Sequence, residues 1–156
     1  MNEHSTNKQP DQAEALSLKL FVVLSHTHKT LMEHALRDMR RYGLNPTEFT
    51  VLELLYHKGP HPIQQIGDKI LLASGSLTYV IDKLEKKELL IRKPSHKDRR
   101  ITYVEISEKG KELFDDIFPQ HAKAIHQVTE GLTAEEKQTA VDLLKKLGLY
   151  AKAGLG

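Results

Sequence analysis

The sequence predicts a mainly α-helical fold with one small β-hairpin, and three observations point to it. Apolar residues recur at intervals of three and four along most of the 156 residues, which is the spacing of one face of a helix. A capping residue followed three positions later by Glu marks three helix starts. The alternation of apolar and polar residues typical of a strand occurs only between residues 89 and 106.

Composition limits the class of protein. Hydrophobic residues make up 39% and charged residues 28% of the chain, which is typical of a globular protein and not of a disordered one. The chain has no cysteine, so a disulfide scaffold, a thiolate metal site and a cysteine redox switch are excluded. The apolar runs are far shorter than the roughly 20 residues of a membrane helix, and the polar first ten residues do not resemble a signal peptide. We therefore expect a cytoplasmic protein with no membrane partner.

The first expected element is a long helix over residues 11–43. Asp11 and Glu14 have the spacing of a capping box, and Gly43 fits a left-handed position at the end. A small domain cannot cover a helix of this length, so part of its apolar face is expected to meet another subunit. That face is a single stripe with helical spacing: Leu16, Leu20, Val23, Leu24, Thr27, Leu31, Ala35, Met39 and Tyr42.

Three shorter helices are expected next. Asn45 caps the first of them, with Pro46 at its first position and Glu48 completing the box, and the run at residues 58–62 ends it. A short helix follows near residues 63–70, and a third extends from the cap Ser74 to about residue 87. The side chains expected to face the core are Phe49, Leu52, Leu55 and Tyr56, then Ile63, Ile66 and Ile70, and finally Leu77, Val80, Ile81 and Leu84.

A hairpin and two further helices complete the chain. Residues 89–93 and 101–106 are expected to be strands joined by a polar loop. Ser107 caps a fifth helix, and Thr133 with Glu136 forms the capping box of a sixth. The apolar stripes of these helices are Leu113, Ile117, Ala124, Ile125 and Val128, then Val141, Leu144 and Leu147.

Three short helices followed by a hairpin is the order of a winged helix-turn-helix, whose recognition helix enters the DNA major groove. The helix at residues 74–87 suits this role, because its outward face carries small hydroxyl residues that allow close approach to bases, and lysines for phosphates. The alternative is an ordinary surface helix with a solvated charged face. The predicted DNA contacts on this helix are Ser74, Gly75, Ser76, Thr78, Tyr79 and Lys83.

The hairpin strengthens the DNA-binding interpretation. From Lys83 to Arg100 there are eight basic and three acidic residues, a local charge of +5 in a chain whose net charge is +2. Such clustering indicates a polyanionic partner, although a solubilising hairpin tip is the alternative. A bidentate contact from Asp98 could hold the Arg100 guanidinium in place, ready for a narrow minor groove. The predicted wing contacts are Arg92, Lys97, Asp98, Arg99 and Arg100.

At these residues the sequence resembles the MarR family of transcriptional regulators. One departure is Glu88, where the family often has Gly at the end of the recognition helix. The wing signature of the family is Asp-x-Arg, an apolar residue and Ser/Thr-x-x-Gly, and here it falls on Asp98, Arg100, Val104, Ile106, Ser107 and Gly110.

The resemblance covers nearly the whole chain and implies a homodimer. Its dimerisation helices would be residues 11–43 and 107–150, at the N- and C-terminal sides of a winged helix-turn-helix lobe over residues 45–106. The dimer would bind a palindromic operator in double-stranded DNA, with repression the commoner outcome in the family. Gln64 and Gln65, near the start of the third helix, would contact the DNA backbone.

The resemblance also implies control by a small molecule, because many members release DNA when an aromatic or phenolic ligand binds between the dimer helices and the winged lobe. The candidate pocket residues are His26, Thr30 and Tyr56, each of which also fits ordinary packing. A metal-responsive regulator of the same fold is an alternative. However, the histidine pairs at 26 and 28 and at 121 and 126 lack the i, i+4 spacing of a helical metal site, so no metal or other cofactor is predicted.

Two other function classes are less consistent with the sequence. An enzyme is not expected, because the chain has no Gly-rich phosphate loop, no nucleophile elbow and no His-Glu-x-x-His motif. A winged-helix module that binds only proteins is the remaining alternative. Such a module does not need the basic cluster, which therefore favours DNA.

Overall fold

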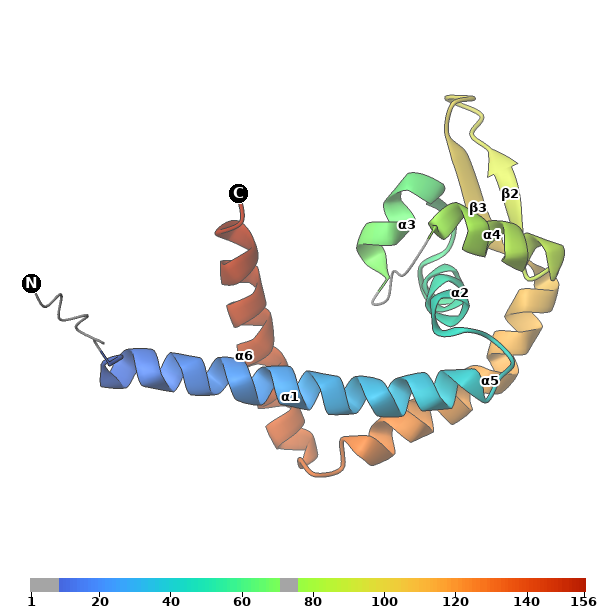
Figure 1. The fold of residues 1–156 in the computed structure, drawn as a ribbon. Helices are drawn as coiled ribbons and strands as arrows, with labels where there is room; N and C mark the ends of the chain where they lie inside the picture. The colour runs from blue at the N-terminus through green and yellow to red at the C-terminus, as the bar shows by residue number, and fades with distance from the viewer. Residues whose placement is uncertain (1–8, 71–75) are drawn as a thin grey trace, which may run out of the picture.

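The computed structural model describes residues 9–70 and 76–156 and is mainly helical with one small sheet. The long helix α1 lies along the base, α5 crosses beneath it, α6 rises from the far end of α5, and α2, α3, α4 and the sheet form a lobe above one end of α1 (Figure 1). In chain order the elements are α1 (Gln12–Arg40), α2 (Pro46–Lys58), β1 (His61–Pro62), α3 (Ile63–Lys69), α4 (Leu77–Lys86), β2 (Leu90–Pro94), β3 (Thr102–Ile106), α5 (Glu108–Val128) and α6 (Ala134–Ala153).

The predicted capping residues begin four of these helices. Asp11, Asn45 and Thr133 each form a complete capping box, and the Ser107 hydroxyl accepts the Gly110 N–H. The end of α1 differs from the prediction, since the helix stops at Arg40 and Gly43, with φ +74°, lies in the turn that follows. The left-handed backbone expected of Gly43 is therefore confirmed, but Gly43 lies beyond the end of the helix and does not cap it.

The start of α4 also differs from the prediction. The helix begins at Leu77, and the Ser76 hydroxyl accepts the Tyr79 N–H at 3.4 Å. Ser76 is therefore the N-cap, because an N-cap side chain accepts a hydrogen bond from the backbone N–H of the second or third helical residue, and Tyr79 is the third residue of α4. The prediction that Ser74 caps this helix is wrong, and Ser74 and Gly75 lie outside the described residues, as does the connection at 71–73.

Within residues 9–70 and 76–156 the sheet has three strands and not the two that were predicted. The hairpin pairs Leu90 with Ile106 and Pro94 with Thr102, and the two-residue strand β1 pairs with β3 on its other side, in the order β1-β3-β2. A strand of two residues shows no alternation, and Pro62 is a residue that sheets tolerate only at an edge. The sequence pattern therefore could not reveal β1.

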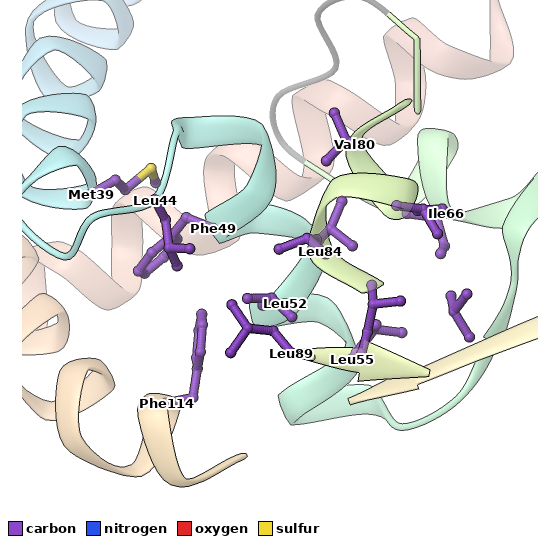
Figure 2. Packing of buried hydrophobic residues seen from close by; sticks show 14 of the residues in the cluster. Met39, Leu44, Phe49, Leu52, Leu55, Ile66, Val80, Leu84, Leu89 and Phe114 are labelled. Atoms are coloured by element: carbon purple, nitrogen blue, oxygen red, sulfur yellow. The ribbon is translucent and has the colours of Figure 1, made fainter. Parts of the chain in front are cut away.

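The core joins the lobe to α5. Phe49 of α2 and Phe114 of α5 are fully buried with ring centroids 5.2 Å apart, and Figure 2 shows them beside Leu44, Leu52 and Leu89. The predicted core residues of α2 and α4 are confirmed, except that Tyr56 and Leu77 are only partly buried. Phe114 was absent from the predicted stripe of α5.

Gly110 shows why the start of α5 needs a glycine. A Cβ at this position would lie 2.2 Å from the Leu89 carbonyl oxygen, a distance that no side chain can accept. The same carbonyl accepts the Ser107 N–H at 3.1 Å, and the Ser107 hydroxyl donates to the Glu88 carbonyl at 2.6 Å. The first turn of α5 is therefore fixed against the link between α4 and β2.

Glu88 provides a test of backbone strain at that link. Among the residues that the structure describes, it alone is a non-glycine with positive φ, +62°, a conformation that costs about 1 kcal/mol for a residue with a Cβ. Glu88→Gly should therefore raise the melting temperature by about 2–4 °C. Glu88→Ala is the matched control, because it removes the same side chain without freeing the backbone. An equal gain in both variants would refute the strain argument.

No helix in the described parts of the chain is both long enough and apolar enough to cross a lipid bilayer.

Candidate nucleic-acid interface

Helix α4 has the two faces that the sequence predicted. Val80, Ile81 and Leu84 are buried against the lobe, whereas Ser76 and Thr78 are exposed. Tyr79 has 66% of its surface exposed, and the Lys83 side chain is 44% exposed. The outward face therefore presents two aliphatic hydroxyls, a phenol ring and an ammonium group, all of which can reach a ligand without unfolding.

The tip of the β2–β3 wing holds a prearranged arginine. The guanidinium of Arg100 donates from Nε and Nη2 to the two carboxylate oxygens of Asp98, each at 3.1 Å, and the Arg100 N–H donates to Asp98 Oδ1 at 3.0 Å. These hydrogen bonds hold the pKa of Asp98 below its usual range. The bidentate contact that the sequence predicted is confirmed, and it leaves the Arg100 side chain 91% exposed.

Arg92, which was also predicted to contact DNA, lies apart from the exposed tip. It lies within β2, 28% exposed, with Nη2 donating to Asp82 at 2.5 Å and Nη1 to Glu85 at 3.0 Å. The hydrogen bond to Asp82 is the main cause that raises the pKa of Arg92. Asp82 and Glu85 stand three residues apart on α4, so one face of that helix offers both carboxylates. Arg92 therefore links α4 to β2. Lys97 and Arg99 remain exposed beside the tip.

Arg92→Met tests this structural role. The variant keeps the aliphatic stem but leaves two carboxylates without their shared cation, so the free energy of unfolding should fall by about 1–2 kcal/mol. Thermal or urea unfolding measures this loss directly. Lys97→Met is the control, because Lys97 is exposed and should leave stability within about 0.5 kcal/mol of the parent. Equal stability of all three proteins would contradict the link.

The remaining predicted residues are spread over three elements. Gln64 and Gln65 are exposed on the first turn of α3, a position open to a DNA backbone. His26 and Thr30 are exposed on α1, whereas Tyr56 packs against α5 and donates to Asp115 Oδ1 at 2.5 Å. The structure therefore does not gather the three residues predicted for an effector pocket.

A polar cluster that the sequence reasoning missed lies where α1, α2 and α5 meet. The buried imidazole of His121 has Nδ1 2.8 Å from Asp38 Oδ2 and Nε2 3.9 Å from Glu53 Oε2, and the Tyr42 hydroxyl donates to Asp38 Oδ2 at 2.9 Å. Burial raises the pKa of Glu53. Burial and the Asp38 hydrogen bond raise the pKa of Tyr42 to about 12. The ring of Phe49 lies 4.7 Å from His121, so the cluster couples the lobe to the long helices.

No grouping suited to a metal ion occurs among the histidine, aspartate and glutamate side chains that the structure describes. His121 is buried whereas His126 is exposed beside Glu130, 3.6 Å away. The two histidines that were considered as a pair therefore face different surroundings.

Comparison with known proteins identifies the family. The sequence model of the MarR family matches residues 44–102. The chain is 58% identical over 136 residues to the HTH-type transcriptional regulator MhqR of Bacillus subtilis, an alignment that covers 87% of this chain and 94% of the relative. The chain belongs to the MarR family. The MarR-family chain is thus a DNA-binding transcriptional regulator, as its helix order and wing motif predicted.

Solved structures share the fold of this MarR-family chain. Sco3205 of Streptomyces coelicolor, a MarR family transcriptional regulator in complex with DNA, superposes with a TM-score of 0.73 at 17% identity and covers 90% of this chain and 92% of its own. NadR in complex with 4-hydroxyphenylacetate superposes with a TM-score of 0.70 at 21% identity and covers 90% of this chain and 96% of its own.

Proposed function

We propose that this MarR-family regulator is a homodimeric repressor whose two lobes bind a palindromic operator. The observation that carries the proposal is the exposed Arg100, fixed by Asp98 at the wing tip. A preset guanidinium suits a narrow minor groove, where negative potential is strongest. The neighbouring α4 has the exposed face that a major groove requires. A bound dimer represses because it occupies promoter DNA that the polymerase needs.

The contacts divide by their chemistry. Ser76, Thr78 and Tyr79 are proposed to meet base edges and Lys83 a phosphate, since hydroxyls read bases and cations neutralise the backbone. At the wing, Arg100 enters the minor groove. Further contacts are proposed for Ser74 and Gly75 before α4, for Lys97 and Arg99 in the wing, and for Gln64 and Gln65 on the DNA backbone.

The apolar surface of α1 and α6 supports the dimer. The first half of α1 exposes Leu16, Leu20 and Val23 together with Phe21 on a second face. A helix that is apolar on several faces is normally buried. In α6 no residue is buried, and exposed leucines recur along it. Apolar patches of this extent mark association surfaces. We propose that residues 11–43 and 107–150 cover them with the same residues of a second copy.

The effector is proposed to be a small hydroxylated aromatic compound, bound at the junction of the lobe and the long helices. A solved neighbour is described with such a ligand, 4-hydroxyphenylacetate. In this chain a cavity of about 160 Å³ between α2 and the end of α3 is lined by residues that include Glu53, His57 and Ile70. Glu53 also lies 3.9 Å from His121 of α5. Glu53 can accept a phenolic hydroxyl, and an occupied cavity would shift α3 relative to α2, changing how the lobe presents its DNA-binding surface.

Selection of bound sequences from random DNA, followed by binding measurements over a salt series, tests the proposed function. We expect a palindromic site and a log–log salt slope of about −0.9 per phosphate neutralised. A panel of phenols should then release the selected DNA, whereas aliphatic acids of similar size should not. A flat salt response with no selected site would favour a protein-interaction module instead.

A further inference from the structure

Glu48 is a buried carboxylate that caps helix α2 and also contacts two lysines. It is 1% exposed in the first turn of α2. Its Oε1 accepts the Asn45 N–H at 3.1 Å, while the Glu48 N–H donates to Asn45 Oδ1 at 2.8 Å. A neutral glutamine would accept the same N–H, so the capping box does not require the negative charge.

The charge of Glu48 faces the recognition helix. Lys87 Nζ lies 2.7 Å from Glu48 Oε2, and Lys83 Nζ lies 3.8 Å from Glu48 Oε1. The two lysines are four residues apart, hence on the same side of the end of α4. A buried carboxylate needs a cation to offset its lost hydration, and Lys87 meets that need at close range. The ammonium group of Lys83 lies farther from the carboxylate, so it can also bind a second anion.

We propose that Glu48 is a positioning residue for DNA binding, which limits where Lys83 can place its ammonium group on the phosphate backbone. The proposal rests on the proposed phosphate contact of Lys83. The negative charge of Glu48 keeps Lys83 on the side of α4 that faces α2, where its ammonium group can reach a phosphate only when the lobe is aligned with the operator. Without that charge, Lys83 can reach phosphates when the lobe sits at other positions along the DNA. Glu48 thereby contributes to specificity without touching DNA.

Glu48→Gln tests the proposal, because it preserves the capping acceptor and removes the charge. Affinity is measured for the selected operator and for an unrelated duplex of equal length, over a salt series. We expect the ratio of specific to non-specific affinity to fall about tenfold, and the salt slope on the unrelated duplex to steepen by about 0.9 per phosphate gained. A capping role alone leaves both quantities unchanged. Glu112→Gln, the same change at an exposed position of α5, is the control.

Lys83→Gln separates this proposal from the proposed function. If Lys83→Gln alone leaves DNA affinity and salt slope unchanged, the phosphate contact of Lys83 is wrong. If Lys83→Gln weakens binding while Glu48→Gln changes neither the ratio nor the slope, only the positioning role is wrong. In the Lys83→Gln background the effect of Glu48→Gln should disappear, and its persistence would contradict the proposal.

Glu48→Asp keeps the experiment decisive if thermal melting shows that Glu48→Gln is unfolded. The shorter side chain remains charged but withdraws from both lysines. The specificity ratio should again fall, and an unchanged ratio in this folded variant would overturn the proposal.

Discussion

Arg100→Ala should abolish most operator binding while leaving the melting temperature unchanged. Each wing would lose a charge-assisted contact of about 2 kcal/mol, which corresponds to roughly 30-fold in affinity. The two wings of a dimer would together lose roughly a thousandfold. The fold is not at risk, because the side chain is 91% exposed and contacts only its own loop. Fluorescence anisotropy with labelled operator and a thermal melt measure the two quantities.

Asp98→Asn is the companion to that variant. It keeps the Arg100 charge but removes the carboxylate that orients it, so affinity should fall by about tenfold, less than for Arg100→Ala. Since the hydrogen bonds from Arg100 lower the pKa of Asp98, the carboxylate stays ionised as the pH falls from 7 to 5, and this contribution should stay constant over that range. Arg100→Ala with parental affinity would mean that the wing tip does not contact DNA.

Leu20→Glu should convert the proposed dimer to monomers and thereby eliminate operator binding. Leu20 is exposed in the single chain, on the apolar part of α1, and the proposed interface would bury one carboxylate from each copy. An uncompensated buried charge costs several kcal/mol, enough to separate the subunits at micromolar concentration. Sedimentation equilibrium should then give 17.7 kDa where the parent chain gives twice that mass.

Lys29→Glu is the control for the dimer variant. Lys29 is also exposed on α1, and it lies six positions after Val23, where the exposed large apolar side chains of α1 end. It should leave the mass of the particle unchanged. A Leu20→Glu protein that remains dimeric would show that this part of α1 is not at the interface.

The elements that could be predicted from the sequence are those specified by neighbouring residues. Asp11, Asn45 and Thr133 start helices through contacts only three residues away. The Asp98–Arg100 pair spans two residues of one loop, so its geometry follows from the local chain.

The errors arise where partners are distant in sequence. The ion pairs of Arg92 were not predicted because its partners Asp82 and Glu85 lie on another element. The buried contacts of His121 were not predicted, since its partner Asp38 is 83 residues away. Phe21 was missed because a single stripe was assumed for α1, whereas the exposed apolar side chains occupy more than one face. The two faces of α4 could be predicted from its amphipathic pattern, but the contacts of Glu48 with Lys83 and Lys87 could be seen only in the tertiary structure.

Hydroxyl-radical footprinting of the selected operator, with the parent chain and with Arg100→Ala, tests most directly whether α4 and the wing act together in a symmetric dimer. The cleavage reagent reports on the minor groove, where the wing tips are proposed to bind. We expect two related half-sites whose centres are about one helical turn, or a multiple of it, apart, each flanked by minor-groove protection that disappears in Arg100→Ala. A single protected half-site, or flanking protection that survives the substitution, would contradict the account.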